Sequence, residues 1–182
     1  MRNKEKILIE TERLILKEIT LDDKEQLFKL YSNLEVHKYT GEPLVESMDE
    51  MEKAIKIRIS DYAKYGYGRW ATFLKNGMQF VGWSGLAYLP EFDEIDIGYR
   101  FFPEYWGLGI ATEASRAILT YGFDQLDLER IIAIAMKENK ASIKVMEKIG
   151  MQFDKFSPYE PEGEDVAWYW CDKNLMSKNK RH

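Results

Sequence analysis

The stretch DEIDIGYRFFPEYWGLGIATEA, residues 93–114, predicts a strand, a turn and the start of a helix. From 94 to 101, large apolar residues alternate with small or charged ones, which is the two-residue period of a strand with one buried face. Pro103 then begins a bend that carries Gly107 and Gly109 directly before a helical pattern. A helix N-terminus that follows a strand and a glycine-bearing turn favours a phosphate ligand.

The two glycines alone leave two interpretations open. Glycine adopts positive φ without strain, so the bend can turn several backbone N–H groups toward an anion at the positive end of the helix dipole. A plain strand-to-helix turn explains Gly107-Leu108-Gly109 equally well. A dinucleotide fingerprint needs a third glycine and an acidic residue about 20 residues further on; the third glycine is missing here, so a dinucleotide site is disfavoured.

The longer string from Pro103 to Ala114 resembles the acetyl-CoA loop of the GNAT superfamily of N-acetyltransferases. More narrowly, it is similar to the RimJ/RimL-type branch, in which Trp-Gly-x-Gly-x-Ala precedes Thr-Glu-Ala. Trp106 then stands where the wider superfamily has Gln or Arg, while Gly109 and Ala111 match its small residues. A second block, NKASIKVMEKIGM at 139–151, resembles the next helix of the family and the beginning of the following strand.

This resemblance covers nearly the whole chain and implies one GNAT domain over residues 1–182, with a flexible tail from about 175. The implied fold is α/β, of an α+β-like kind, with a mixed and mostly antiparallel central sheet flanked by helices on both faces. Its fourth and fifth strands, here near 94–101 and 130–136, run parallel and splay apart. The pantetheine arm of CoA lies in that gap like an added strand.

The patterns elsewhere agree with this plan. A first strand is expected at 13–19, and Asn76-Gly77 predicts a tight hairpin between two further strands. Thr20 and Ser47 each open a capping box before an amphipathic helix. The first of these helices is expected to bury Leu27, Leu30, Tyr31 and Leu34, and the second Met48, Met51, Ile55, Ile59 and Tyr62.

Composition narrows the function classes. The net charge of −5 argues against a nucleic-acid surface and is compatible with a cationic acceptor. No apolar run reaches the roughly 20 residues of a membrane span, and the N-terminus lacks the apolar centre of a signal peptide, so we expect a cytoplasmic protein without membrane contact. Cys171 is expected to be a buried structural residue rather than an acyl-carrying nucleophile. No metal site is predicted, and a monomer and a homodimer are both consistent with the sequence.

Roles for individual residues follow from the resemblance. His37 and Tyr39 lie between two helices that border the acceptor site in the family, and Trp83 is expected in the core or a pocket wall. The acceptor-binding residues implied are Tyr31, His37, Tyr39 and Trp83. The residues implied for acetyl-CoA are Ile97, Gly98, Tyr99, Trp106, Gly107, Leu108, Gly109, Ile110, Ala111, Asn139 and Ser142.

Acetyl transfer to an amine needs a neutral nucleophile, a donor to the oxyanion and a proton for the departing thiolate. Asp96 or Glu94 is the candidate base, through water; the alternative for Asp96 is a solvent-facing or ion-paired strand residue. A backbone N–H near Ile97 is the candidate oxyanion donor. Many family members have a tyrosine at the place of Met146, so its absence directs attention to Ser142, which could contact the CoA sulfur or satisfy a first-turn N–H.

The function implied is transfer of an acetyl group from acetyl-CoA to a primary amine by direct attack in a ternary complex. The acceptor is either a protein N-terminus, such as that of a ribosomal protein, or a small amine. The alternative is a non-catalytic acyl-CoA-binding sensor or interaction module. The missing tyrosine favours that alternative, whereas Ser142 together with Asp96 argues against it.

Overall fold

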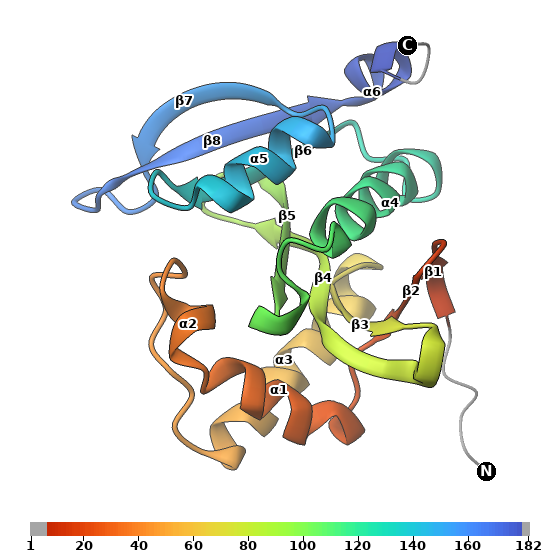
Figure 1. Ribbon diagram of the computed structural model, residues 1–182. Coiled ribbons are helices and arrows are strands. Elements are labelled where there is room, and N and C mark those ends of the chain that lie inside the picture. Colours follow the sequence, from red (N-terminus) through yellow and green to blue (C-terminus); the bar gives the residue numbers. More distant parts are fainter. Residues whose placement is uncertain (1–6, 180–182) are drawn as a thin grey trace.

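The computed structural model describes residues 7–179, which form one eight-stranded sheet with helices on both faces (Figure 1). The strand order is β1-β2-β3-β4-β5-β6-β8-β7, and each neighbouring pair is antiparallel except β5 and β6. The strands are β1 (Ile7–Glu10), β2 (Leu14–Glu18), β3 (Arg69–Leu74), β4 (Gln79–Leu89), β5 (Glu94–Phe101), β6 (Arg130–Met136), β7 (Gln152–Pro158) and β8 (Asp165–Asp172). The helices are α1 (Lys24–Tyr31), α2 (Leu34–His37), α3 (Met48–Tyr65), α4 (Ile110–Asp124), α5 (Lys140–Lys148) and α6 (Lys173–Asn179). This architecture confirms the expected fold class.

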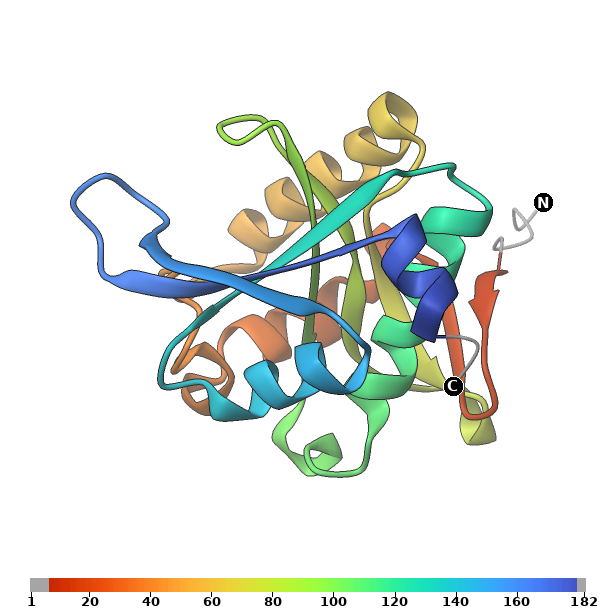
Figure 2. The same ribbon diagram turned by 90° about the horizontal axis from the view of Figure 1, so that it is seen from above.

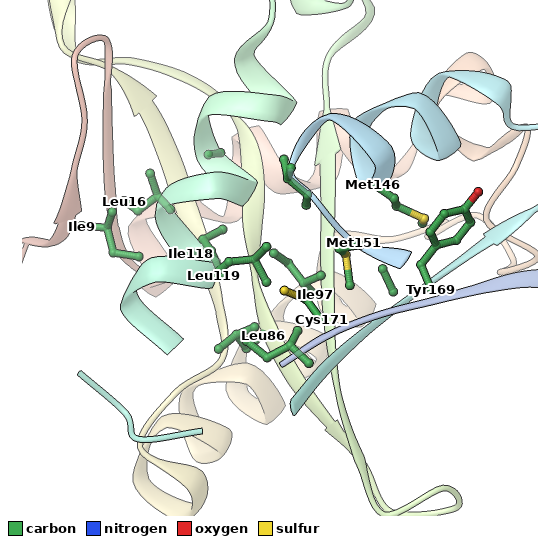
Figure 3. Close-up of a cluster of buried hydrophobic side chains, with 14 of the residues drawn as sticks. Ile9, Leu16, Leu86, Ile97, Ile118, Leu119, Met146, Met151, Tyr169 and Cys171 are labelled. Atoms are coloured by element: carbon green, nitrogen blue, oxygen red, sulfur yellow. The ribbon is translucent and has the colours of Figure 1, made fainter. Parts of the chain in front are cut away.

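Two hydrophobic clusters hold the layers together, one on each face of the sheet. Figure 2 shows α3 on one side of the strands and α4 and α5 on the other. On the second side, Ile118 and Leu119 of α4 pack toward Leu86 of β4 and Ile97 of β5 (Figure 3). Full burial of each such side chain stabilises the fold by about 1.5–3 kcal/mol. The opposite cluster joins α1 and α3 to β3 and β4.

The N-terminal half departs from the expected elements in two ways. A strand at Ile7–Glu10 was not predicted, so the splayed pair is β5 and β6 rather than the fourth and fifth strands. Leu34 and Ile59 are exposed, not buried as predicted. Leu34 begins a new short helix, α2, which is capped by Asn33 and does not continue α1. The buried side of α3 runs through Ile55 and Tyr62 and leaves Ile59 outside.

The hairpin between β3 and β4 forms as predicted, but its turn is wider than a two-residue one. Positive φ angles occur at Gly77 (78°) and Met78 (50°), so the segment Asn76–Met78 is an irregular turn rather than a regular helix. The predicted pair of positive φ angles at Asn76 and Gly77 is therefore displaced by one residue.

Where a flexible tail was expected from about residue 175, the described residues Lys173–Asn179 form the helix α6. The carboxylate of Asp172 accepts a hydrogen bond from the backbone N–H of Leu175, and Met176 is buried in the core. A capped first turn and one buried side chain hold this helix. Residues 180–182 lie outside the described residues.

The parallel strands β5 and β6 are joined, in the part of the chain that the structure describes, by the single residue pair Asp96 and Ile132. Beyond this pair, toward the C-terminal ends, the edge of β5 that faces β6 has no ladder partner. Unpaired strand edges bind extended segments through their backbone groups. The splay predicted from the resemblance is thus present, and it opens toward Tyr99 and the loop after β5. Within residues 7–179, no helix has the length and apolar character needed to span a bilayer.

Cys171 on β8 is fully buried, and burial raises the pKa of its thiol to about 11. At pH 8 about one thiol in a thousand is then ionised, and the thiolate is the reactive form. We expect a disulfide reagent to label this cysteine only after denaturant is added, as followed by absorbance of the released thiol. Stoichiometric labelling of the folded protein within minutes would contradict the structural role.

Candidate active site

The loop after β5 presents backbone N–H groups at the start of α4. Gly107 and Gly109 have φ angles of 74° and 78°, in the left-handed region that suits glycine. No side chain of residues 7–179 caps the N-terminus of α4, so its first N–H groups are available to an anion. The indole Nε1 of Trp106 donates to the carbonyl of Phe101 over 2.8 Å, which fixes the loop against the end of β5.

Arg13, directly before β2, supports this loop, and no local sequence pattern indicates that role. Its Nη1 donates to the carbonyl of Leu108 over 2.9 Å, and its Nε pairs with the Glu113 carboxylate of α4 at 2.6 Å. The same carboxylate accepts from the Thr11 hydroxyl and from the Arg13 backbone N–H. The N-terminal hairpin is therefore tied to the loop and to the first turn of α4.

Glu113 gives a pH-dependent test of that tie. Burial raises its pKa, but the hydrogen bonds from Thr11 and Arg13 outweigh burial and leave the pKa below its ordinary value of 4.5. A lowered folded-state pKa stabilises the protein above pH 4.5, and that contribution disappears as the pH falls through the folded-state pKa. Glu113→Gln should cost about 1–2 kcal/mol of unfolding free energy at pH 7. In urea titrations the difference from the unsubstituted protein should shrink below pH 4.5; a pH-independent difference would argue against this role.

Tyr99 and Ser142 meet at the open end of the gap between β5 and β6. The phenol of Tyr99 donates to Ser142 Oγ over 3.1 Å, which links β5 to the first turn of α5. The backbone N–H of Ser142 is satisfied by Asn139 Oδ1 at 3.1 Å, as the predicted cap requires. The Ser142 hydroxyl therefore does not serve as a helix cap, one of its two expected roles. Met146, one turn later, is buried in the core.

Tyr99 was predicted to contact acetyl-CoA through its backbone, but its partly buried phenol is also a hydrogen-bond donor at this place. Burial raises the pKa of its phenol, and the hydrogen bond to Ser142 opposes this only in part. The phenol therefore keeps its proton at neutral pH and can donate it. Sequence reasoning missed this role because the family's usual tyrosine comes from the helix, whereas this one comes from β5.

Asp96 lies at the closed end of the gap, on the opposite face of β5 from Tyr99. It is buried and forms an ion pair with Arg69 of β3. Burial raises the pKa of Asp96, and the guanidinium opposes that rise. Gly98 leaves room for the pair, because a Cβ there would lie 2.8 Å from Arg69 Nη1. Of the two interpretations of Asp96, this geometry agrees with the ion-paired strand residue.

Glu94, the other candidate base, is not brought to these groups. It pairs with Arg130 at 3.1 Å near the start of β5. Five residues separate it from Tyr99, or about 17 Å along a strand. Among residues 7–179, no group of three or more His, Cys, Asp or Glu side chains is arranged for a metal ion.

Three of the four residues predicted to bind the acceptor come together on the α1–α3 side of the sheet. The ring of Tyr31 lies edge-on to His37 with centroids 5.9 Å apart, and Trp83 lies on β4 opposite Arg100 of β5. Tyr39 does not join them; its ring contacts Lys38. The Trp83 cluster is defined as Tyr31, His37, Arg58, Trp83 and Arg100.

A hollow of about 800 Å³ lies away from the gap, between the β1–β2 hairpin and α4. It touches the loop through Gly109 and includes Arg13 and Glu113. Neither Tyr99 nor Ser142 lines this hollow, so it is not the place where we expect the reaction.

Comparison with known proteins agrees with this geometry. The family model described as an acetyltransferase (GNAT) domain matches residues 13–152. YoaA of Bacillus subtilis, described as an uncharacterised N-acetyltransferase, is 35% identical over 149 residues, which cover 80% of this chain and 82% of YoaA. The crystal structure of a GNAT-family acetyltransferase from Bacillus anthracis has a TM-score of 0.78 at 28% identity and covers 91% of this chain and 98% of its own.

RimL, the ribosomal L7/L12 α-N-protein acetyltransferase, has been solved in complex with coenzyme A. It shares the fold with a TM-score of 0.81 at 20% identity, covering 93% of this chain and 99% of RimL. The match of the family model and the identity to YoaA go further than the fold. The chain therefore belongs to the GNAT family and is an acetyl-CoA-dependent N-acetyltransferase.

Proposed function

We propose that this protein transfers the acetyl group of acetyl-CoA to a primary amine at the gap between β5 and β6. The observation that carries the proposal is the hydrogen bond from Tyr99 to Ser142 at the mouth of that gap. This bond supports the proposal because it joins a protonated phenol to a hydroxyl at the open edge of β5, the strand that leads into the loop proposed to bind pyrophosphate. A mere binding module needs the edge and the loop but not the paired hydroxyls.

The described residues fit CoA. In the proposed complex, the N–H groups from Gly107 to Ala111 bind the pyrophosphate, and the backbone of Ile97 to Tyr99 binds the pantetheine arm. The exposed side chains of Trp106 and Leu108 flank the loop and supply apolar contact. Bound acetyl-CoA supplies the activated acetyl thioester.

In the reaction, the neutral amine nitrogen bonds to the acetyl carbonyl carbon and the carbon–sulfur bond breaks. The proton lost from nitrogen leaves through water, and the thiolate takes a proton from Tyr99 through the Ser142 hydroxyl. The phenol is then reprotonated from solvent. We assign Asp96 the role of positioning the Arg69 guanidinium rather than that of general base, because its carboxylate is held in the ion pair with Arg69. Placing the two reactants together contributes up to about 7–11 kcal/mol in the best intramolecular cases.

Two acceptor classes remain within this proposal: a protein N-terminus and a small amine. The name of RimL describes α-N-acetylation of a ribosomal protein. Its likeness to this chain is one of fold, so it supports a protein N-terminus as acceptor only by analogy of fold. The charges of the Trp83 cluster bear on the second class.

Mass spectrometry of acceptors incubated with acetyl-CoA and the protein tests the proposal. The set contains N-terminal peptides, amino acids, polyamines and aminoglycosides. One acetyl group on the nitrogen of at least one acceptor, absent when the protein is omitted, is the expected result. Tight acetyl-CoA binding without acetylation of any acceptor would instead favour the non-catalytic module.

A further inference from the structure

The guanidinium groups of Arg58 and Arg100 lie over the same two aromatic rings of the Trp83 cluster. Each makes one hydrogen bond through Nη2, Arg58 to the Tyr31 hydroxyl and Arg100 to the Glu42 carboxylate. The Cζ atom of Arg100 lies 4.5 Å from the Tyr31 ring centre and 5.4 Å from that of Trp83. The Cζ atom of Arg58 lies 5.8 Å and 5.2 Å from the same two centres. Two cations from β5 and α3 therefore converge on one aromatic wall. A third, Arg69, also lies over Trp83 but is engaged by Asp96.

This cluster holds buried donors without acceptors. Among the described residues, five buried side-chain nitrogen or oxygen atoms lack a hydrogen-bond partner, and four of them belong to the cluster. They are Arg58 Nε, Arg100 Nη1, Trp83 Nε1 and His37 Nε2. The first three can only donate. Because Arg100 is 8% exposed and Trp83 6%, water reaches these atoms poorly, and a buried donor without an acceptor is destabilising.

A carboxylate already occupies one side of Arg100. Glu42, in the segment between α2 and α3, accepts from Arg100 Nη2 over 3.0 Å. Its side chain is 57% exposed, so the pairing is weak and solvent-screened. Asp96 is paired with Arg69, the third guanidinium over Trp83. Among the ion pairs of residues 7–179, the exposed Glu42 is the only carboxylate paired with Arg58 or Arg100.

We infer that the acceptor is a small primary amine that also carries a carboxylate, which binds Arg100 and Arg58 in the Trp83 cluster. This inference rests on the proposed acetyl transfer. A carboxylate offers about four acceptor positions and matches the planar donor fork of a guanidinium. Because Arg100 and Trp83 are almost fully buried, their side chains must shift to admit the carboxylate, which favours a small acceptor.

The cluster lies close to the reacting end of the gap. Arg100 follows Tyr99 directly on β5, so their Cα positions are about 3.3 Å apart along the strand, with the side chains on opposite faces. An acceptor whose carboxylate binds Arg100 therefore has to extend its amine through the open gap between β5 and β6 to reach the face of Tyr99. The nearby guanidinium groups also lower the pKa of that amine, which increases its neutral, nucleophilic fraction. They repel a polyamine, although the chain as a whole has a charge of −5.

Matched acceptor pairs test the inference directly. Each amino acid is compared with the amine formed by removing its carboxylate, and spermidine is included as a cationic acceptor. Initial rates of acetylated product give kcat/KM for both members. We expect the carboxylate member of at least one pair to exceed its partner by tenfold or more, and spermidine to be a poorer acceptor than that member. A general preference for spermidine or for the decarboxylated amines would overturn the inference while leaving acetyl transfer intact.

An arginine variant separates recognition from folding. Arg100→Met should raise KM for the carboxylate acceptor roughly 10- to 100-fold, and leave KM for its decarboxylated partner within about threefold. A purely structural role would change both alike. Lys56→Met is the matched control, because it removes one positive charge from an exposed position on α3 and should keep the ratio. An unchanged ratio in Arg100→Met would overturn the inference.

A second variant works at an exposed residue and so does not depend on the folding of Arg100→Met. Glu42→Gln removes the competing carboxylate and should lower KM for the carboxylate acceptor several-fold, with spermidine unaffected. An unchanged or higher KM would contradict the assignment. If the unsubstituted protein acetylated none of the acceptors, the proposed function would be overturned, and this inference with it.

Discussion

Gly109→Glu is expected to weaken acetyl-CoA binding by at least about 100-fold. Gly109 has φ of 78° and ψ of 4° at the N-cap of α4, where a non-glycine residue is strained by about 1–3 kcal/mol. The new carboxylate would also place a negative charge at the helix N-terminus that is proposed to bind the pyrophosphate. Isothermal titration calorimetry with acetyl-CoA measures the change in affinity.

Gly77→Glu is a close control for the backbone strain. Gly77 has the same φ of 78° and ψ of 4°, but it lies in the β3–β4 turn with no atom within 4 Å of an added Cβ. It should lose stability through the same strain and retain acetyl-CoA affinity within about threefold. If both variants lost affinity equally, general destabilisation would explain the effect, and the loop would not be the pyrophosphate site.

Ser142→Ala is expected to lower kcat by roughly 100-fold and to leave acetyl-CoA affinity within about threefold. Positioned proton transfer contributes typically 10²- to 10⁴-fold to rate, and the substitution removes the hydroxyl between Tyr99 and the thiolate. The backbone N–H of residue 142 still bonds Asn139, so α5 keeps its cap. Single-turnover rates and calorimetry separate the two quantities.

Tyr99→Phe and the double variant extend that test. If phenol and hydroxyl act as one relay, Tyr99→Phe should slow turnover to a similar degree, and the double variant should be hardly slower than either single one. Ser60→Ala on α3, whose hydroxyl bonds only the Ile57 carbonyl, serves as the control. Equal turnover in Ser142→Ala and the unsubstituted protein would remove Ser142 from the mechanism.

Most of the fold could be predicted from local sequence patterns. The Thr20–Asp23 capping box, the alternation along β5 and the glycines before α4 act within a few residues, so sequence alone exposes them. The errors arose where packing decides. Leu34 was assigned to a helix that had already ended, and α6 depends on a single buried Met176 in a polar segment.

The candidate site was predictable in part for the same reason. The loop and Asn139 lie in contiguous motifs, whereas Arg13 reaches Glu113 across about 100 residues of chain. The charge of the Trp83 cluster is likewise invisible in the sequence, since Arg58 and Arg100 come from separate elements of an acidic chain. Tyr99 was identified for its backbone, and only the fold revealed what its hydroxyl contacts.

Acceptor-dependent release of free CoA thiol from acetyl-CoA is the most direct measurement of acetyl transfer by this protein. We predict release that rises with acceptor concentration, matches acetylated amine one for one and falls sharply in Ser142→Ala. Absence of release with every acceptor, from folded protein that binds acetyl-CoA, would contradict catalysis at the gap between β5 and β6.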